Sequence, residues 1–385
     1  MKILLLNYEC PPLGGGGGVA ALTLARALVR LGLEVDYVTS HYGALPREQT
    51  DEGVRIFREP VWGRKNIETA SIVSMLSFPK AAVARGLRLA RQQRYDLVHT
   101  HFAIPTGPAG YLLSRRLRLP NVLTVYGGDI YDPTKRYSPH RNPVLRFAVT
   151  RILNQADIVI PESTDLCERT AAIYRTRTPI QRIPLGFAPP IFPAATRAEL
   201  GLREGRLYAL AIGRIVRRKA YHDLVRALKI SGIEDLDLLI VGDGPEEARL
   251  RKLTTELGLT DRVHFLGHVD DTVKFQYLRV ADMFALASVH EGFGIVFLEA
   301  MYCGLPIVTT NVGGQTDFLH EGRNALLVEP GHPERFGAAL ARLADDTALR
   351  RRMSDSNRDD VKAFFADNIA RQYIQVFESI MQRKR

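Results

Sequence analysis

The sequence predicts an α/β protein of two doubly wound domains that face each other across a cleft. Strand-like apolar stretches alternate with helix-like stretches along its 385 residues, and a proline-rich segment at 183–193 interrupts both. That length corresponds to two domains, or at most three. The composition, 46% hydrophobic and 24% charged, is that of an ordinary globular protein. Strands alternating with helices form parallel sheets covered on both faces, and ligands bind beyond the carboxyl ends of the strands.

The first half of the chain alternates between short strands and helices. Strands are expected at 2–7, 34–40, 54–59, 96–101, 121–126 and 157–162. Helices are expected at 18–31, 78–94, 106–118 and 143–154. The prolines of 183–193 fit neither kind of element, so this segment is taken as the linker.

The second half repeats the alternation. Strands are expected at 207–213, 237–241, 263–266, 282–287, 306–310 and 325–328. Helices are expected at 221–230, 245–258, 293–303, 333–344 and, last, near 367–381. The expected domains are therefore residues 1–188, with a C-terminal helix at 366–385 packed back on them, and residues 189–365.

Several protein classes are excluded by what the sequence lacks. No apolar stretch approaches the roughly 20 residues of a membrane span. The first residues turn polar at Asn7 without a signal-peptide cleavage site. Cys10, Cys167 and Cys303 lie far apart, which argues against a disulfide scaffold or structural zinc and fits a reducing cytosol. No P-loop motif is present.

The positive charge lies entirely in the first half. Residues 1–190 contain 25 basic and 15 acidic residues, whereas residues 191–385 contain 27 of each. Segment 61–95 contains seven basic residues and a single acidic one, Glu68. Two interpretations stay open: a solvated helix face, or a surface that meets a membrane leaflet, a phosphorylated acceptor or nucleic acid.

The most specific motif spans residues 288–301, after an expected strand and into a helix. Gly292 and Gly294 permit a tight turn, and the helix start then presents unpaired N–H groups to a phosphate or to sugar oxygens. Glu291 and Glu299 lie about two turns apart on roughly one side, where carboxylates accept hydroxyl donors. An ordinary capped helix is the less specific alternative.

A second motif ends the first strand of the second half. Gly213 and Arg214 are followed by Lys219, so a guanidinium and an ammonium stand where strand ends meet ligand. Such a pair suits a diphosphate. Plain surface charge is the alternative.

A third motif, the glycine run at 14–18, follows the first strand. Gly15, Gly17 and Ala20 fit the dinucleotide-binding pattern G-x-G-x-x-A, but that pattern needs an acidic residue at the end of the next strand. Here the strand ends Thr-Ser-His at 39–41, which weakens the case for NAD. The glycines still permit close approach of a ligand.

Polar residues also follow two strands of the first domain. His99 and His101 are candidates for the acceptor side, although histidines at such positions are more often structural. Asp129, behind two glycines, is the better candidate for holding a hydroxylated acceptor. The triplet at 235–237 matches a DxD metal motif, but it precedes a strand and is interpreted as surface.

Together these motifs resemble the retaining, nucleotide-sugar-dependent glycosyltransferases of family 4, which have the GT-B fold. The resemblance covers nearly the whole chain, and the Glu-x7-Glu string at 291–299 is its most specific part. It implies that the second domain binds the nucleotide sugar and that no divalent metal or other cofactor is needed. The residues implied in donor binding are Gly15, Gly16, Gly213, Arg214, Lys219, Glu291, Gly292, Phe293, Gly294, Ile295 and Glu299.

Within that resemblance, Arg214 and Lys219 hold the diphosphate, Glu291 the transferred sugar and Glu299 the ribose. Arg214, Lys219 and Glu291 are the implied catalytic residues. Three departures matter: Ala220 stands where the family often has glycine, Tyr126 where it often has a histidine, and Asp317 where it more usually has a glutamate, so that this side chain reaches slightly less far. The role of that histidine does not carry over, and Tyr126 is kept as an acceptor-side candidate.

The expected function is retaining transfer of a sugar to a hydroxyl acceptor, with an anionic, lipid-linked or polysaccharide acceptor as the hypothesis. Segment 61–95 is then the expected contact with the inner face of a cell membrane, and the protein is expected in the cytoplasm. Three alternatives stay open: a nucleotide-sugar 2-epimerase, an NAD-dependent oxidoreductase, and a non-enzymatic nucleic-acid or membrane binding protein. Glu291 and Glu299 argue against nucleic acid, because carboxylates repel phosphates.

Overall fold

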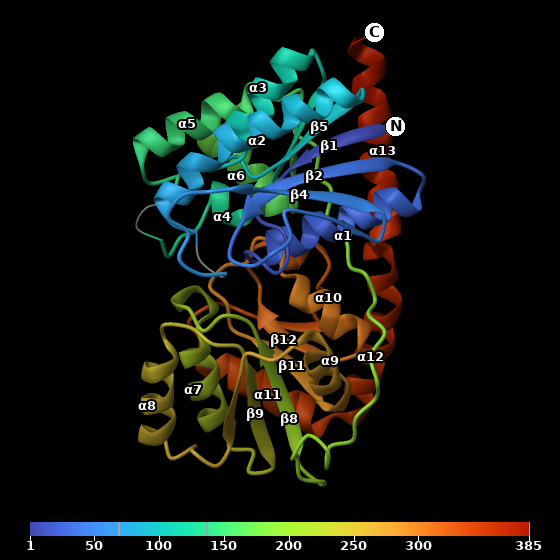
Figure 1. The fold of residues 1–385 in the computed structure, drawn as a ribbon. Coiled ribbons are helices and arrows are strands. Elements are labelled where there is room, and N and C mark those ends of the chain that lie inside the picture. The colour runs from blue at the N-terminus through green and yellow to red at the C-terminus, as the bar shows by residue number, and fades with distance from the viewer. Residues whose placement is uncertain (68–69, 136–137, 385) are drawn as a thin grey trace. The chain divides into compact units, whose positions relative to one another are not determined.

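The computed structural model describes residues 1–67, 70–135 and 138–384, and it divides into two compact units (Figure 1). Unit 1 comprises Met1–Ala188 and Phe364–Arg385, and unit 2 comprises Pro189–Ala363. The division falls inside the proline-rich segment 183–193. Glu68 of the basic segment and the final residue of the expected helix 366–385 lie outside the described residues.

Unit 1 contains a sheet in the order β3-β4-β2-β1-β5-β6-β7, and only β3 runs antiparallel to its neighbour. The strands are β1 (Lys2–Leu6), β2 (Glu34–His41), β3 (Glu48–Asp51), β4 (Val54–Pro60), β5 (Leu97–His101), β6 (Asn121–Val125) and β7 (Ile158–Pro161). The helices are α1 (Gly16–Arg30), α2 (Ile72–Gln92), α3 (Gly107–Leu117), α4 (Gly127–Ile130), α5 (Pro143–Leu153), α6 (Thr164–Tyr174) and α13 (Ala366–Lys384).

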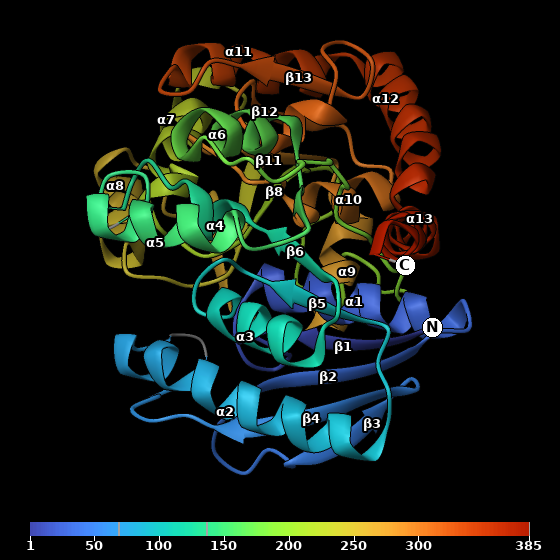
Figure 2. The same ribbon diagram turned by 90° about the horizontal axis from the view of Figure 1, so that it is seen from above.

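Alternate side chains of the central strand β1 reach the two helical layers of unit 1. Ile3 and Leu5 are fully buried in a cluster with residues of α1 and α13. Leu4 and Leu6 point the other way, into a cluster with residues of α2 and α3. Figure 2 shows α2 and α3 side by side, and α13 is the red helix at the C-terminus in Figure 1.

Unit 2 contains an all-parallel sheet in the order β10-β9-β8-β11-β12-β13. The strands are β8 (Leu207–Ile212), β9 (Leu236–Val241), β10 (Val263–Gly267), β11 (Met283–Leu286), β12 (Ile307–Thr310) and β13 (Ala325–Val328). The helices are α7 (Tyr221–Ser231), α8 (Glu247–Glu256), α9 (Asp271–Val280), α10 (Ile295–Tyr302), α11 (Pro333–Asp345) and α12 (Thr347–Asp360).

Both sheets therefore have the doubly wound strand order, in which the chain starts at the centre and reverses direction once. The reversal lies between β1 and β5 in unit 1 and between β8 and β11 in unit 2. The expected fold class, two doubly wound α/β domains, is confirmed. Ligand sites in such sheets lie at the reversal, beyond the carboxyl ends of the two strands. The candidate sites are therefore the loops that follow β1 and β5 in unit 1 and β8 and β11 in unit 2.

Several elements differ from the sequence-based expectation. β3, α4, α6, α9 and α12 were not anticipated. Helix α2 begins at Ile72 and not at 78, because Ser71 and Ser74 form a reciprocal capping box, and Pro79 lies inside the helix. Helix α1 begins at Gly16 and not at 18. Glycine has a low helix propensity, so the prediction from sequence began this helix two residues too late.

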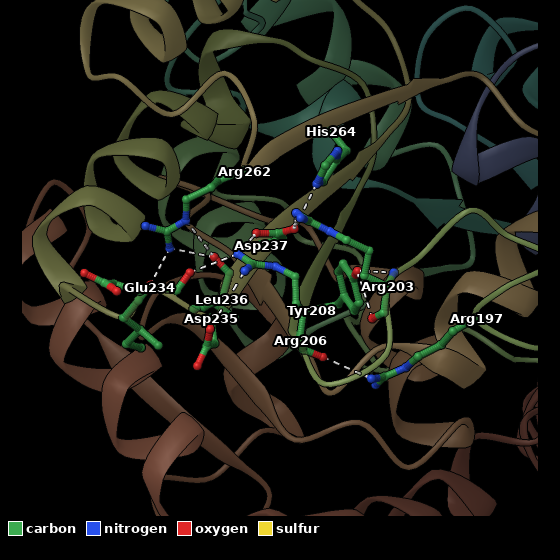
Figure 3. A network of polar contacts seen from close by, with 11 residues as sticks. Arg197, Arg203, Arg206, Tyr208, Glu234, Asp235, Leu236, Asp237, Arg262 and His264 are labelled. Atoms are coloured by element: carbon green, nitrogen blue, oxygen red, sulfur yellow. Dashed lines mark hydrogen bonds and ion pairs between the residues drawn. The ribbon is translucent and has the colours of Figure 1, made fainter.

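The DxD-like triplet is only partly at the surface, which corrects the interpretation from sequence. Asp235 is exposed, but Asp237 is fully buried at the start of β9. Its carboxylate is held by the Arg206 guanidinium and lies 3.1 Å from Nε2 of His264 (Figure 3). Strand β9 lies between β10 and β8 in the sheet, so the side chain of Asp237, its second residue, is covered by neighbours and needs charged partners.

Candidate active site

The two loops at the reversal of unit 2 are joined by their backbones. The loop after β8 carries Arg214 and the short turn Arg217–Lys219, and the loop after β11 carries Glu291. The Val289 N–H donates to the Arg218 carbonyl at 2.9 Å. The residues of the first two motifs are thus brought to one place.

Glu291 is the buried centre of this place. Its Oε1 lies 2.7 Å from Nζ of Lys219 and accepts a hydrogen bond from the Ser288 hydroxyl at 2.6 Å. Its Oε2 accepts from Arg218 at 3.0 Å. Burial alone raises the pKa of this carboxyl, but Lys219 and Arg218 outweigh burial and lower the pKa to about 2. Glu291 is therefore ionised at neutral pH.

Lys219 is buried beside Glu291. Burial lowers the pKa of its ammonium, and the Glu291 carboxylate opposes that change. Ala220 follows in the left-handed conformation, with φ of +46°. A non-glycine residue is uncommon there, which accounts for the glycine that the family resemblance leads one to expect at this position.

Helix α10 starts beside Glu291 without a side-chain cap. Gly294 precedes it with φ of +90°, and an added Cβ would lie 2.6 Å from Phe297, so glycine is needed. The helix begins at Ile295, two residues later than expected, because the chain turns at Gly294. Its first turn carries no acidic side chain, and the Phe297 N–H donates to the Gly294 carbonyl at 2.9 Å, so the N–H groups of Ile295 and Val296 are the ones that an anion could bind. Phe293 is buried against Phe318 and anchors the turn.

Glu299 lies in the second turn of α10. Its Oε1 is 2.7 Å from Nζ of Lys274, a residue of α9. Burial raises the pKa of Glu299, and Lys274 opposes that rise. Lys274 was missed from the sequence because helix α9 was not anticipated and no motif surrounds it.

The loop after β12 supports the backbone of Glu291. The Gly314 N–H donates to the Glu291 carbonyl at 2.8 Å. Gly313 has φ of +88°, and an added Cβ would lie 2.4 Å from that carbonyl oxygen. Only glycine permits this approach, so the two glycines position Glu291.

Arg214 stays a candidate for the diphosphate, and Arg218 was missed from the sequence. Arg214 is exposed and forms no ion pair within the described part of the chain. Arg218, which was not a candidate, holds both the carboxylate of Glu291 and the His290 carbonyl. The sequence showed that several basic residues gather between 214 and 219. Which of them contacts Glu291 is decided by the three-residue turn Arg217–Lys219.

At the reversal of unit 1, a carboxylate occupies the helix start. Oε2 of Glu9, in the loop after β1, accepts from the Gly15 N–H at 3.0 Å where α1 begins. Burial raises the pKa of Glu9, while that hydrogen bond and Arg64 oppose the rise. The space beside Gly16 is open. Glu9 was not among the candidates, because a single acidic residue before two prolines carries no motif.

Asp129 joins two loops of unit 1. Its carboxylate accepts from the backbone N–H groups of Ala103 and Tyr126. Burial raises its pKa to about 7, although both hydrogen bonds lower it. The expected acceptor-side residue therefore fixes the loops after β5 and β6 to each other.

His99 and His101 lie in the core, which corrects their placement on the acceptor side. Side chains two residues apart on β5 share a face, and helix α13 covers that face with Tyr373 and Phe377. His101 Nδ1 lies 2.7 Å from the hydroxyl of Tyr126, which is therefore also turned inward. Burial lowers the pKa of His101 to about 3.

Phe102 was also missed. It lies directly after β5 in the left-handed conformation, with φ of +70°. Its ring occupies the space that a side chain at Gly17 would need and lies 4.6 Å from the ring of Tyr126. A bulky residue at positive φ is strained, and such strain concentrates at functional sites.

Two family models match this chain. One, described as glycosyl transferases group 1, matches residues 194–360, and the other, described as a glycosyl transferase 4-like domain, matches residues 15–186. They cover the greater part of unit 2 and of unit 1, respectively.

Individual proteins are similar over nearly the whole chain. The chain is 28% identical to N-acetyl-alpha-D-glucosaminyl L-malate synthase of Bacillus anthracis, over 98% of each chain. It is 30% identical to D-inositol 3-phosphate glycosyltransferase of Mycobacteroides abscessus, over 89% of this chain and 81% of that one. The solved structure of sucrose-phosphate synthase from Thermosynechococcus elongatus is 25% identical, covers 99% of both chains and has a TM-score of 0.86.

These similarities do not favour the alternatives of an epimerase, an NAD-dependent oxidoreductase or a non-enzymatic binding protein. They agree with the resemblance inferred from the motifs and with both doubly wound sheets. The chain belongs to the group 1 glycosyltransferase family, and the protein is a glycosyltransferase.

Proposed function

We propose that this glycosyltransferase binds a nucleotide diphosphate sugar at the reversal of unit 2 and transfers the sugar with retention of configuration. One observation carries the proposal. An ionised carboxylate, Glu291, is held by Lys219 and Arg218 directly beside the uncapped start of α10. A carboxylate, a buried cation and the N–H groups of a helix start together match a sugar with hydroxyl groups on a diphosphate.

The proposed chemistry rests on stabilising the leaving group. The bond between the sugar C1 and the diphosphate oxygen breaks, and a bond from C1 to the acceptor oxygen forms on the same face. The acceptor proton goes to the departing phosphate. Lys219, Arg214 and the N–H groups of α10 stabilise the negative charge that grows on this phosphate, which is the dominant contribution in such sites.

Two carboxylates would orient the donor. Glu291 accepts hydroxyl groups of the transferred sugar, and Arg218 and Ser288 keep it in place as positioning residues. Glu299 accepts ribose hydroxyls, with Lys274 holding its other side. No divalent metal takes part in this scheme, because Lys219 and Arg214 would balance the charge of the diphosphate.

We assign acceptor recognition to unit 1 and infer an anionic or lipid-linked acceptor at the inner face of a membrane. The excess of ten positive charges in residues 1–190 supports this assignment. The two relatives named above also support it, because their printed names include L-malate and inositol 3-phosphate. Asp129 then acts by holding the loops around the acceptor.

A thermal-shift panel of UDP-, GDP- and ADP-sugars tests the donor proposal. A donor present at 100 times its Kd stabilises the protein by about 2.7 kcal/mol, so the correct class raises Tm above the others. Lys219→Ala should abolish the shift, whereas Arg217→Ala, a neighbour whose side chain is 76% exposed, should keep it. NMR of the product with added acceptor then reads the anomeric configuration. An inverted product, or no shift with any donor, would contradict the proposal.

A further inference from the structure

We propose that unit 1 docks on an anionic phospholipid leaflet through an apolar patch at the start of α2. This docking patch consists of Trp62, Ile67, Ile72, Val73 and Leu76. The inference deepens the proposed function, since it names the surface that would bring a lipid-linked acceptor to unit 1. Within the described residues, no helix is long and apolar enough to cross a membrane, so the contact proposed is peripheral.

The large apolar side chains of the docking patch are exposed to solvent. Trp62 is 74% exposed, Ile72 is 72% and Leu76 is 76%. Apolar side chains gathered in this way mark interaction sites. Two more, Val144 and Phe147 of α5, are equally open, and in Figures 1 and 2 the start of α2 and helix α5 both lie toward the left of unit 1.

Helix α2 carries its apolar and basic residues at opposite ends of one exposed face. Its inner face buries Phe78, Ala82 and Leu89. The outer face, read at helical spacing, runs through Ile72, Leu76, Lys80, Ala84, Arg88 and Arg91. The first turn is therefore apolar and the last turns are basic, so the helix end and not its whole length is suited to enter a lipid headgroup layer.

Basic residues outnumber acidic ones in the sequence around the docking patch and in segment 131–147. Segments 61–80 and 131–147 together contain seven Lys or Arg residues and two acidic ones. Asp132 and Arg64 are buried, and Glu68 and Arg136 lie outside the described residues. Lys65 and Lys80 are exposed next to the apolar residues. Each such residue near an anionic leaflet contributes about 1 kcal/mol, so this charge complements phospholipid headgroups.

The same charge argues against a second copy of the chain as the occupant. A symmetric contact would place this patch against itself and bring like charges together. An anionic leaflet instead accepts both the apolar side chains and the surrounding cations.

The basic end of α2 is a poorer docking surface than its sequence indicated. The Arg85 guanidinium is only 11% exposed and pairs with Glu48 at 2.7 Å and Glu59 at 2.5 Å. Arg88 lies about 18 Å from Leu76 along the helix axis. That distance exceeds the Debye length of about 8 Å at physiological salt, so the two ends act independently.

The docking patch is also connected to the reversal of unit 1. Helix α2 follows β4, so its start lies at the carboxyl edge of the sheet, as Glu9 and Asp129 do. The Gly14 N–H donates to the Ile67 carbonyl at 3.2 Å. A membrane at the patch would thus lie at the edge where we place the acceptor.

The chain provides its own probe, because Trp62 is its single tryptophan. Fluorescence of the full chain is titrated with vesicles of phosphatidylglycerol and phosphatidylcholine at low salt. We expect a blue shift that brominated lipid quenches and that high salt or pure phosphatidylcholine weakens. An unshifted emission together with no flotation on the anionic vesicles would overturn the inference.

Matched variants separate the two ends of α2. The double variant Ile72→Ser/Leu76→Ser should weaken vesicle partitioning on the order of 10- to 100-fold, and Ile230→Ser in unit 2, 52% exposed, should not. Lys65→Ala and Lys80→Ala should each weaken vesicle partitioning about fivefold at low salt. Arg88→Ala/Arg91→Ala should change it less than twofold; an equal or larger loss would place the contact at the basic end instead.

Two readouts keep this inference distinct from the proposed function. Sedimentation without lipid detects self-association, and a blue shift that follows protein concentration alone would refute lipid docking. The donor-induced thermal shift is measured on the same variants without vesicles. If Ile72→Ser/Leu76→Ser keeps that shift and loses partitioning, both proposals stand. If the wild type shows the donor shift but never binds vesicles, only the docking inference fails.

Discussion

At both reversals of strand order a helix starts beside a buried carboxylate, but the charges around that carboxylate differ between the two units. In unit 2, helix α10 starts without a cap, and cations surround one ionised carboxylate, Glu291. In unit 1, helix α1 also starts without an acidic residue of its own, but the carboxylate of Glu9 accepts the N–H of Gly15, directly before the helix. Burial raises the pKa of the unit 1 carboxyls Glu9 and Asp129, whereas that of Glu291 is lowered.

The comparison teaches that the fold supplies a positive helix end at each reversal, but that side chains decide which ligand binds there. An open helix end with cations suits a diphosphate. A helix end already holding a carboxylate repels a second anion and leaves room for a neutral hydroxyl group. The doubly wound strand order, which both units share, therefore does not indicate by itself that unit 2 and not unit 1 binds the donor.

The largest expected effect comes from removing the buried cation of unit 2. Lys219→Ala should lower kcat on the order of 10²- to 10³-fold, because one preorganised charge no longer stabilises the leaving diphosphate. Arg214→Ala should fall in the same range. Turnover with the true donor, measured by product release, checks both values.

Neighbouring arginines sharpen this test. Arg217→Ala removes a solvent-exposed charge of the same turn and should change kcat less than twofold. Arg218→Ala should cost about tenfold, since it leaves Glu291 with one charged partner fewer, and Arg218→Lys should recover part of the loss. If Lys219→Ala keeps more than half of wild-type turnover, the diphosphate is held elsewhere.

The second prediction uses the opposite pKa shifts of two carboxyl groups, Asp129 in unit 1 and Glu291 in unit 2. Asp129, with its pKa raised to about 7, contributes stability that is present below its ordinary pKa near 4 and is lost as the pH rises toward 7. Glu291, with its pKa lowered to about 2, contributes stability that is lost only as the pH falls from near 4.5 to 2. Between pH 4.5 and 7, the titration of Asp129 should therefore weaken unit 1, whereas Glu291 makes no such contribution in unit 2. The buried His99 and His101, whose pKa values are lowered, oppose the loss in unit 1, and Glu299, whose pKa is raised, adds a loss in unit 2.

Hydrogen exchange of peptides from each unit, with urea unfolding at pH 5 and 7.5, measures the difference. Asp129→Asn should reduce the loss for unit 1 between these pH values by on the order of 1 kcal/mol or more. Asp165→Asn, at a surface pair with Arg169, is the control and should leave the loss unchanged. A loss that is the same in Asp129→Asn as in wild type would contradict the assignment.

The smallest expected effect concerns the occupied helix end of unit 1. Glu9→Ala should lower the free energy of unfolding by about 1 kcal/mol, because the Gly15 N–H loses its acceptor. Glu9→Gln keeps an acceptor oxygen and should cost less. Urea unfolding compares the two; an equal loss would show that the negative charge, and not the hydrogen bond, stabilises α1.

Much of the fold and part of the site could be predicted from sequence. Apolar strands alternating with helices predicted both sheets, and the 288–301 string located Glu291 and the start of α10. Strand β3 was missed because its residues, Glu-Gln-Thr-Asp, have no apolar alternation at the sheet edge. The early start of α2 was missed because Pro79 argued against a helix there, whereas the capping box of Ser71 and Ser74 starts the helix before that proline.

The remaining errors share one physical cause. A side chain at a strand end faces ligand or core according to what packs over it, and sequence does not show the packing. His99 and His101 follow the expected pattern of site residues, yet α13, far along the chain, covers them. Arg218 and Lys274 carry no motif, yet they hold Glu291 and Glu299.

The sequence by itself determined the doubly wound class, the glycines at tight turns and the family, because periodicity and local backbone demands act over short stretches of chain. The tertiary structure decided which charges meet. Only folding places Lys219 beside Glu291 and Glu9 at the tip of α1, and ionisation depends on those neighbours and on burial, which no short stretch of sequence contains.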